Sequence, residues 1–417
     1  MRNIFDQFEQ PENRVTHALM TALDLDRGLL AAFLHELVKV KPPRGVKQLG
    51  LLEQRYPGQP EQREEEDEKR GVPDGWIFDE KRRWCVFIET KVLIKLTAAQ
   101  IERHRRTALR RGYILAKPIV ILPRSALSLP SDVTVIEWRD VYAWLLKKRA
   151  KSQWARHLAN YLEVIERKLI DTKQFREDTL TKFAGFPFSA DEPYTYLEGK
   201  RLLNLAMDEL RQRRSLQRKL GVNRKHKGRG AITGKRGDAV WDFLSLSKTS
   251  DKKLFTHDPH LTLGITSRAV EVTLTLPNGL NRSMRNAVKT LDLDGFLELL
   301  AAVLKRLRPM LRKHKGAVPI FRGVQRRYLS QRAQPFVDAR IDFDLRTAVA
   351  SKDRPKLQPV WAKAAYDAFV RKRGTNYQVQ VGVVFPYERC PEVARDDALD
   401  LVEQSWLACA PVVSLVK

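Results

Sequence analysis

The sequence contains few cysteines and no long apolar stretch. Cys85, Cys390 and Cys409 are widely spaced in 417 residues, so they cannot form a disulfide framework or a cysteine-based zinc site. No run of about 18 uncharged apolar residues occurs, and the opening segment MRNIFDQFEQPENR lacks the apolar region of a secretory signal. We therefore expect a cytoplasmic protein without structural zinc, redox chemistry or membrane insertion.

Acidic residues are outnumbered in this chain. There are 76 Lys and Arg against 50 Asp and Glu, a net charge of +26, in a composition that is 43% hydrophobic and 30% charged. Those fractions fit a globular protein and exclude collagen-like or wholly disordered chains. The positive excess predicts a polyanionic partner, with DNA first and RNA as the alternative. A membrane surface is not favoured, because the basic residues form no amphipathic anchor beside a large apolar face.

The length and the charge distribution both indicate more than one domain. The chain is roughly three times the commonest domain size of about 100 to 150 residues. Residues 1–150 carry 27 basic and 21 acidic side chains, whereas residues 151–417 carry 49 and 29. We place a boundary near residue 150, followed by a helical and basic linker region at 151–236. Residues 237–417 would form an α+β domain that binds nucleic acid or a partner.

The first 150 residues alternate apolar strands with amphipathic helices. Apolar residues recur at helical spacing after Pro11, and aromatic and branched residues on both sides of the turn EKR predict a β-hairpin. The expected hairpin strands are 72–79 and 84–91. A helix at 97–111 follows, with Thr97 as its N-cap and Gly112 as its C-terminal stop. Strands at 117–122 and 132–138 and a helix at 141–148 complete the pattern. This order predicts a mixed α/β sheet.

The later part of the chain shows period-two strands. Alternation predicts antiparallel strands at 260–265, 269–276, 336–345 and 378–385, and helical spacing predicts an amphipathic helix at 293–311. This pattern favours an α+β domain.

Two carboxylates meet in the predicted hairpin. If the hairpin turns symmetrically about Lys81 and Arg82, Asp74 lies opposite Glu89, and Lys91 points to the same face as Glu89. Directly opposed side chains have Cβ atoms about 4.5 to 5.5 Å apart, and like charges repel there unless a cation or a proton joins them. The register therefore predicts a charged cluster with room for a cation.

The cluster follows a strand that is apolar on both faces. An acidic residue two positions before a lysine occurs seven times in the chain, but only Glu89 with Lys91 follows such a strand. Hard cations prefer oxygen ligands, so Asp74, Glu89 and a main-chain carbonyl near Thr90 predict an Mg²⁺ site, with Mn²⁺ as the alternative. Lys91 would orient or help deprotonate the attacking water, which points to phosphodiester hydrolysis.

Two helical polar residues extend this cluster. Glu12 shares a helical face with Val15 and Leu19, and an acid that faces the core needs a partner. Gln100, in the first turn of the helix after the hairpin, would position phosphate or solvent, and His104 lies one turn further on the same face.

These residues together resemble the motif of the PD-(D/E)XK nuclease superfamily, over about the first 145 residues. The resemblance implies a restriction-endonuclease-like αβββαβ core with Asp74 and Glu89 as Mg²⁺ ligands and Lys91 as the catalytic lysine. Glu12 matches the helical glutamate that assists the metal in many members, and Gln100 matches the helical glutamine of the family.

The resemblance also carries two departures. His104 stands where some members have a tyrosine, and the first core strand has only the highly charged segment 60–70 as a candidate by position. Members that combine such a core with a second domain often resemble restriction, repair or phage-defence nucleases, so by analogy the resemblance implies a nuclease of that kind, with endonuclease and exonuclease modes both open.

The segment 211–236 holds eleven Lys or Arg and no acidic residue. We expect an arm that tracks phosphates, and its neutralised phosphates would make binding salt-dependent. The residues expected to contact nucleic acid are Arg213, Arg214, Arg218, Lys219, Arg224, Lys225, Lys227 and Arg229. The alternative is a solvated linker.

Simpler readings of the cluster stay open. Asp74, Glu89 and Lys91 could form a surface ion-pair cluster, because a one-residue slip would separate their faces. Glu12 could interact favourably with the dipole at the N-terminus of its helix, and Gln100 could be an ordinary polar residue of the helix face.

The expected function is a Mg²⁺-dependent deoxyribonuclease; the alternatives are an RNA-cleaving enzyme and a nucleic-acid-binding scaffold with a vestigial core. Without a phosphate-binding Gly-x-x-x-x-Gly-Lys-Ser/Thr loop, any ATP-driven step would need a protein partner, and a homo-oligomer is also compatible with the sequence.

Overall fold

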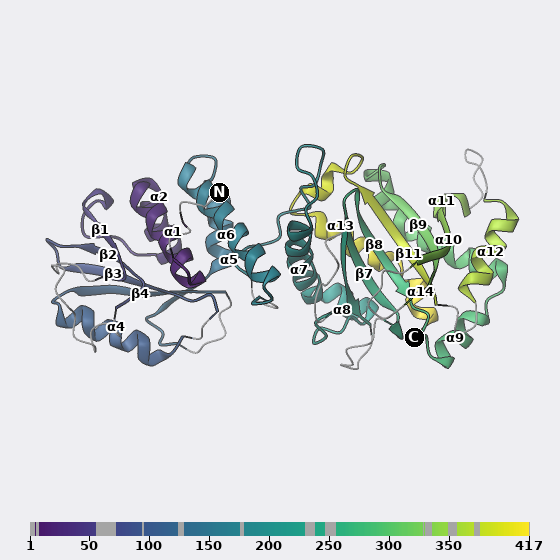
Figure 1. Ribbon diagram of the computed structural model, residues 1–417, viewed down its shortest axis with the longest axis horizontal. Helices are drawn as coiled ribbons and strands as arrows, with labels where there is room; N and C mark the ends of the chain where they lie inside the picture. Colours follow the sequence, from purple (N-terminus) through teal and green to yellow (C-terminus); the bar gives the residue numbers. More distant parts are fainter. Residues whose placement is uncertain are drawn as a thin grey trace. The chain divides into compact units, whose positions relative to one another are not determined.

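The computed structural model divides the chain into two compact units, residues 1–182 and residues 183–417 (Figure 1). The described residues are 5, 8–55, 72–93, 96–123, 129–175, 179–229, 238–246, 256–327, 329, 336–348, 357–370 and 376–416. Each unit has its own apolar core.

The division falls later than the boundary near residue 150 that charge counting suggested. Helix α6 (Gln153–Asp171) packs against α1 (Pro11–Leu25) and α5 (Trp138–Lys148), and its Leu158 and Leu162 are fully buried in the core of the first unit. The predicted linker region 151–236 is therefore shared, because α6 belongs to the first unit while the next two helices belong to the second.

The first unit is built on a mixed five-stranded sheet in the order β1-β2-β3-β4-β5. Its strands are β1 (Gly50–Glu53), β2 (Gly75–Asp79), β3 (Trp84–Thr90), β4 (Ile114–Leu122) and β5 (Thr134–Glu137). Strands β1 to β3 are antiparallel, whereas β4 runs parallel to both β3 and β5. The hairpin register is confirmed, since Trp76 pairs with Phe87 and Asp79 pairs with Trp84.

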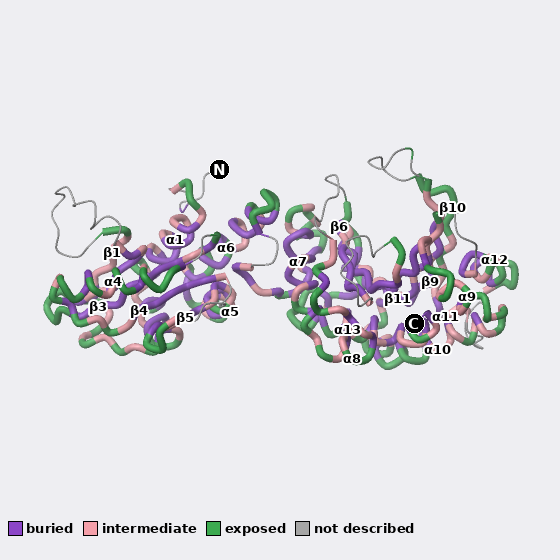
Figure 2. Tube along the Cα trace, turned by 90° about the horizontal axis from the view of Figure 1, so that it is seen from below, coloured by how far each residue is buried: buried purple, intermediate pink, exposed green. Residues whose placement is uncertain are grey.

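Helices cover both faces of this sheet (Figure 1). Val86 and Ile88 of β3 pack into the core formed with α1, α5 and α6, whereas Cys85 and Phe87 pack into the core formed with α4 (Ala98–Arg110). Every residue of β3 is buried, and Figure 2 shows this central strand as a buried stretch. The remaining helical segments are α2 (Arg27–Ala32), a π-helical turn (Phe33–Val38) and a 3-10 turn (Val46–Gln48).

Two expectations about this unit need correction. The strand that pairs with β2 is Gly50–Glu53, earlier in the chain than the proposed segment 60–70, which lies outside the described residues. The apolar pair Leu51 and Leu52 makes this stretch a better strand than the charged one. Thr97 precedes α4 as expected, but its side chain makes no capping hydrogen bond.

The second unit contains a six-stranded antiparallel sheet in the order β10-β9-β11-β8-β7-β6. Its strands are β6 (Ala239–Ser245), β7 (His260–Thr266), β8 (Ala269–Leu276), β9 (Val318–Arg327), β10 (Phe336–Asp344) and β11 (Tyr377–Pro386). The four predicted strands are confirmed as antiparallel, and β6 and β9 are additional. Strand β10 lies at one edge and is mostly exposed, as Figure 2 shows.

Helices pack on one face of this sheet. The described helices are α7 (Tyr196–Gln212), α8 (Arg214–Leu220), α9 (Arg282–Lys289), α10 (Leu293–Lys313), α11 (Leu345–Ala348), α12 (Pro359–Phe369), α13 (Ala398–Ala408) and α14 (Ala410–Leu415), with a 3-10 turn at Pro391–Ala394. Phe296 of α10 contacts Phe321 of β9, and the Trp406 indole of α13 donates to the Thr273 carbonyl oxygen. Within the described ranges, no helix has the length and apolar character needed to cross a membrane.

Candidate active site

The end of β3 brings Asp74 and Glu89 together. Gly75 pairs with Ile88, so Asp74 follows directly beyond the ladder beside Glu89, as the register predicted. The Thr90 main-chain N–H donates to Asp74 Oδ2 at 2.7 Å, and the Thr90 hydroxyl donates to the same oxygen at 3.1 Å. These two hydrogen bonds hold the Asp74 carboxylate at the point where the central strand ends.

Glu89 is the most connected side chain of the cluster. Its side chain is 1% exposed, and Oε1 accepts hydrogen bonds from Lys91 Nζ at 2.6 Å and from Gln100 Nε2 at 2.5 Å. The other oxygen, Oε2, lies 3.1 Å from Nε2 of His104, which is also buried. Gln100 and His104 lie one turn apart on α4, so one helical face supplies both partners.

The pKa shifts follow from this arrangement. Burial and, after it, the negative charge of Glu89 raise the pKa of Asp74 to about 6. Burial acts to raise the pKa of Glu89, but the hydrogen bond to His104 and the charge of Lys91 outweigh it and leave that pKa lowered. Burial acts to lower the pKa of Lys91, but the charges of Glu89 and Asp74 outweigh it and leave that pKa raised. The site is thus a pair of carboxylates, Glu89 buried and Asp74 partly buried, whose repulsion Lys91 partly offsets.

Glu12 joins the site from α1. Its side chain is buried, and its Oε1 accepts a hydrogen bond at 2.8 Å from the main-chain N–H of Leu93, just after β3. The Glu12 charge also raises the pKa of Lys91. Thr16 lies one turn later and contacts the Thr90 hydroxyl at 2.5 Å, oxygen to oxygen. Helix α1 therefore holds both the loop after β3 and the residue that positions Asp74.

The donor set suits a hard cation. In the described part of the chain, no group of three His, Cys, Asp or Glu side chains is placed to hold a metal ion. Mg²⁺ is commonly bound through one or two carboxylates, with waters and substrate phosphate completing its coordination, so Asp74 and Glu89 would suffice. The mutual repulsion that raises the pKa of Asp74 is the condition that a divalent cation would relieve. The expected carbonyl ligand near Thr90 stays a prediction.

The basic residues predicted to bind nucleic acid lie in the second unit. Six of them are exposed on α8 or in the turn that follows it: Arg214, Arg218, Lys219, Arg224, Lys225 and Lys227. The other two make contacts within the unit. Arg213 donates to Asp400 at 2.6 Å and also to Glu403, and the Arg229 guanidinium lies 4.1 Å from the centroid of the Trp241 ring.

The described part of segment 211–236 is folded rather than an extended arm. It completes α7, forms α8 and continues to Arg229, while residues 230–236 lie outside the described ranges.

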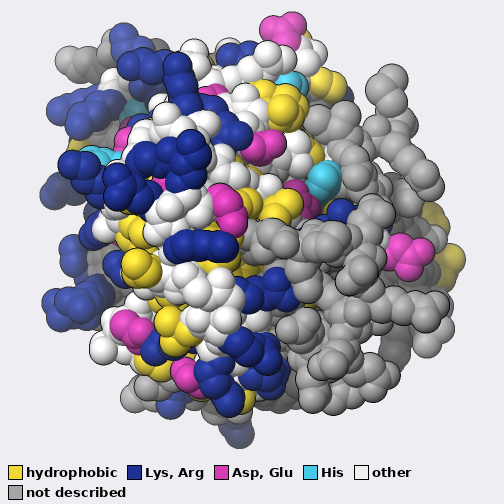
Figure 3. Space-filling view, turned by 90° about the vertical axis from the view of Figure 1, so that its left-hand side faces the viewer, with side chains coloured by type: hydrophobic (Ala, Val, Ile, Leu, Met, Phe, Trp, Pro, Cys, Tyr) yellow, Lys and Arg dark blue, Asp and Glu magenta, His cyan; other side chains and the backbone are white. Residues whose placement is uncertain are grey.

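Sequence reasoning missed the basic surface of α4. Arg103 and Arg106 are exposed on the helix that supplies Gln100 and His104 to Glu89. The signal was the stretch 101–111, IERHRRTALRR, which carries five arginines. Figure 3 shows Lys and Arg side chains spread over the described part of the face it presents, with a few carboxylates between them. The helix that supports Glu89 therefore also carries exposed positive charge.

Comparisons with models of protein families, with curated proteins and with solved structures find no match to this chain.

Proposed function

We propose that this protein is a divalent-metal-dependent nuclease that hydrolyses phosphodiester bonds of DNA, with a restriction-endonuclease-like core in its first unit. The observation that carries the proposal is the convergence of Asp74, Glu89 and Lys91 at the end of a fully buried strand. The chain order of helix, three antiparallel strands, helix and strand supports it, because it is the order that the motif resemblance implied.

Each side chain has a defined part in this proposal. Asp74 and Glu89 would hold Mg²⁺, which when bound would stabilise the charge that develops on the scissile phosphate. Lys91 places an ammonium group 2.6 Å from Glu89 Oε1, where it would orient the attacking water and the phosphate. Gln100 and His104 hold Glu89 in one orientation, and Glu12 fixes the backbone after β3.

The remaining basic surface would hold the substrate. Residues 183–417 carry 42 Lys and Arg against 24 Asp and Glu, a net charge of +18, which favours a polyanion. The exposed residues of α8 and the turn after it would contact phosphates, so affinity should fall steeply with salt.

The test is cleavage of plasmid and linear DNA by the purified protein with Mg²⁺, Mn²⁺ or EDTA. We expect metal-dependent cleavage that Glu89→Gln and Lys91→Ala each remove, while both variants still bind DNA in a mobility-shift assay. The matched controls are Glu36→Gln and Lys148→Ala, which break an ion pair of the same unit with a separation of 2.5 Å, away from the cluster. Cleavage that persists in both site variants would exclude this site.

One observation favours a second candidate, a nucleic-acid-binding scaffold with an inactive core. Both oxygens of Glu89 already lie within 3.1 Å of protein nitrogens, those of Lys91, Gln100 and His104, which would compete with a metal ion. Salt-sensitive binding with no metal-dependent cleavage of matched DNA and RNA substrates would favour the scaffold. Cleavage of RNA alone would identify an RNA-processing enzyme instead.

A further inference from the structure

The sheet of the second unit has a polar cavity on the face that its helices leave uncovered. Strand β8 alternates, so that Val270, Val272 and Leu274 face the apolar core, whereas Thr273 and Thr275 line the cavity. The cavity has a volume of about 670 Å³, within the range of about 300 to 1,000 Å³ typical of sites for small organic ligands. It is built from five strands of one sheet and belongs to the second unit, whereas the Asp74 and Glu89 cluster belongs to the first.

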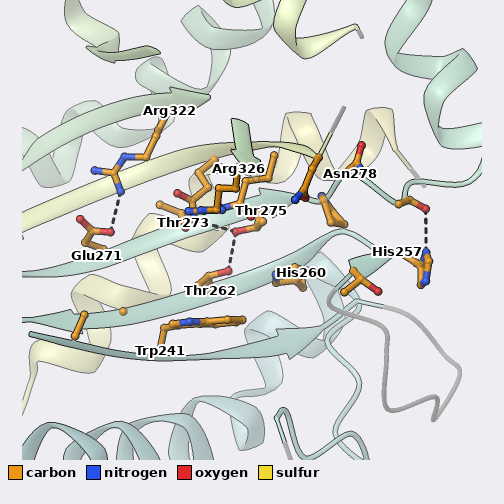
Figure 4. A pocket seen from close by; sticks show the side chains of 18 of the residues that line it. Trp241, His257, His260, Thr262, Glu271, Thr273, Thr275, Asn278, Arg322 and Arg326 are labelled. Atoms are coloured by element: carbon orange, nitrogen blue, oxygen red, sulfur yellow. Dashed lines mark hydrogen bonds and ion pairs between the residues drawn. The ribbon is translucent and has the colours of Figure 1, made fainter. Parts of the chain in front are cut away.

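One wall of the cavity is an aromatic platform. The Trp241 ring lies along the bottom of the cavity in Figure 4, on strand β6. Its cross-strand partner on β7 is Gly264, which has no side chain that would cover the ring. The Arg229 guanidinium lies 4.1 Å from the ring centroid, and Arg229 is not among the described residues that line the cavity. Arg229 therefore contacts the Trp241 ring from outside the cavity lining, while the ring itself lines the cavity, and an aromatic ring in a cavity wall is a surface on which a planar group can stack.

The middle of the cavity offers both donors and acceptors. The hydroxyls of Thr262 and Thr275 lie 2.7 Å apart, and the Gln380 amide lies 3.4 Å from the Thr275 hydroxyl (Figure 4). His260 also lines the cavity, and burial lowers its pKa to about 4, so its ring is neutral at physiological pH. Hydroxyl, amide and neutral imidazole groups suit the hydrogen-bonding edge of a heterocycle.

The far side of the cavity is positively charged. Arg322 and Arg326 line it from β9, and Glu271 is the one carboxylate among the described lining residues. Arg322 donates to Glu271 at 2.9 Å and to Asp342 at 3.0 Å, which fixes its guanidinium. Figure 4 shows Arg326 on the same side of the sheet as Thr273 and Thr275. The lining thus has a net positive charge at the end where an anionic group would enter.

We propose that this cavity binds a nucleotide, with the base on Trp241, its edge toward Thr262, Thr275 and Gln380, and its phosphate toward Arg326. A planar platform, a polar middle and a cationic end match, in that order, the face of a base, its hydrogen-bonding edge and a phosphate. The nucleotide can come from solution or from a nucleic-acid strand whose base has left the stack. This site does not depend on the nuclease activity of the first unit.

The experiment is calorimetric titration of the full-length protein with adenosine, guanosine, cytidine and thymidine monophosphates. The matching nucleosides and ribose 5-phosphate separate the contribution of the base from that of the phosphate. A second arm compares duplexes with and without one unpaired base, using Glu89→Gln protein so that no cleavage intervenes. We expect at least one monophosphate or the duplex with the unpaired base to bind, and the arm that binds more tightly identifies the source of the nucleotide.

Three variants test the assignment. Trp241→Ala should weaken binding at least tenfold, Trp241→Phe should retain part of it, and Arg326→Gln should weaken the phosphate-bearing probes but not the nucleosides. The control is Trp361→Ala, because Trp361 is an exposed tryptophan of α12 outside the cavity. Thermal unfolding of each variant separates loss of fold from loss of the site. No binding of any probe, or equal binding by wild type and by folded Trp241→Ala and Trp241→Phe proteins, would overturn the proposal.

Discussion

At the residue scale, Glu89 determines the geometry of the candidate active site. Its two oxygens face Lys91, which follows directly after β3, and Gln100 and His104 from α4. The sequence was sufficient to predict that Asp74, Glu89 and Lys91 meet, because strand register depends on local pattern alone. It was not sufficient to predict that His104 pairs with Glu89, because that contact depends on how α4 packs against the sheet.

The first expected result concerns His104 as a positioning residue. His104→Leu removes the nitrogen 3.1 Å from Glu89 Oε2 and frees one carboxylate oxygen to move. We expect about a 10- to 100-fold loss in metal affinity or cleavage rate, the usual effect of removing a partner that orients a metal ligand. The measurement is the cleavage rate as a function of Mg²⁺ concentration.

Two comparisons keep the His104 result interpretable. His104→Gln retains a donor and should recover part of the activity, while His157→Leu, on the surface of α6, should leave the rate unchanged. An unchanged Mg²⁺ dependence in His104→Leu would show that Glu89 needs no support from α4.

The second expected result concerns the buried Asp242 of β6. Burial raises its pKa to about 6, although its Oδ1 accepts hydrogen bonds from the main-chain N–H groups of Arg229 and Phe243 at 2.9 and 2.8 Å. The folded state therefore retains this proton to higher pH than the unfolded state does. The free energy of unfolding should fall as pH rises from about 4 to about 6, by at most about 3 kcal/mol from this group, and then stay level.

Asp242→Asn isolates that contribution. The amide oxygen can accept the same two hydrogen bonds, so the variant should gain stability relative to wild type as pH rises through this window. Urea unfolding at pH 4, 5, 6 and 7 measures the difference. A difference that does not depend on pH would mean that Asp242 titrates normally in the folded protein.

At the scale of elements, the hairpin and α4 illustrate what sequence patterns can predict. The apolar strand at 84–90 and the stop at Gly112 have purely local causes, and both are where the pattern placed them. Strand β1 was not predicted, because four residues are too few to show a recognisable strand pattern. Segment 60–70 was chosen instead from its position before the hairpin. Strand β9 has adjacent buried residues rather than strict alternation, so a search for period two passed over it.

The third expected result tests the end of α4. Gly112 has a φ of 76°, and a Cβ built there would meet no atom within 4 Å. Gly112→Ala should therefore cost about 1 to 2 kcal/mol of unfolding free energy through backbone strain alone. The control is Gly45→Ala, at a φ of −60° with ordinary contacts, which should be neutral or stabilise by about 0.4 to 1 kcal/mol. Equal effects in denaturant unfolding would exclude strain as the cause.

At the scale of the whole molecule, the division into two units follows from two separate cores. Composition and length indicate more than one part in the chain and a more basic later part. It placed the boundary too early, because charge counting does not detect that α6 buries its apolar face against α1 and α5.

The fourth expected result is that the units are independent. Fragments 1–182 and 183–417 should each unfold in one cooperative transition, because each retains a complete core. Circular dichroism during heating is the measurement. Fragment 183–417, with a net charge of +18 against +8 for fragment 1–182, should keep most of the salt-dependent affinity for DNA. A fragment that stays unfolded would show that its core needs the other unit.

Strand β10 has a consequence for how the protein behaves when concentrated. As an edge strand it presents main-chain hydrogen-bonding groups that another chain could pair with. Its sequence alternates charge, with Asp338 bonded to Arg327 at 3.3 Å and Arg340 paired with Asp342. If two copies paired along this edge, the charged side chains of the two β10 strands would come into contact and lose hydration, which is unfavourable. The charged edge thus discourages the strand-to-strand pairing that starts aggregation.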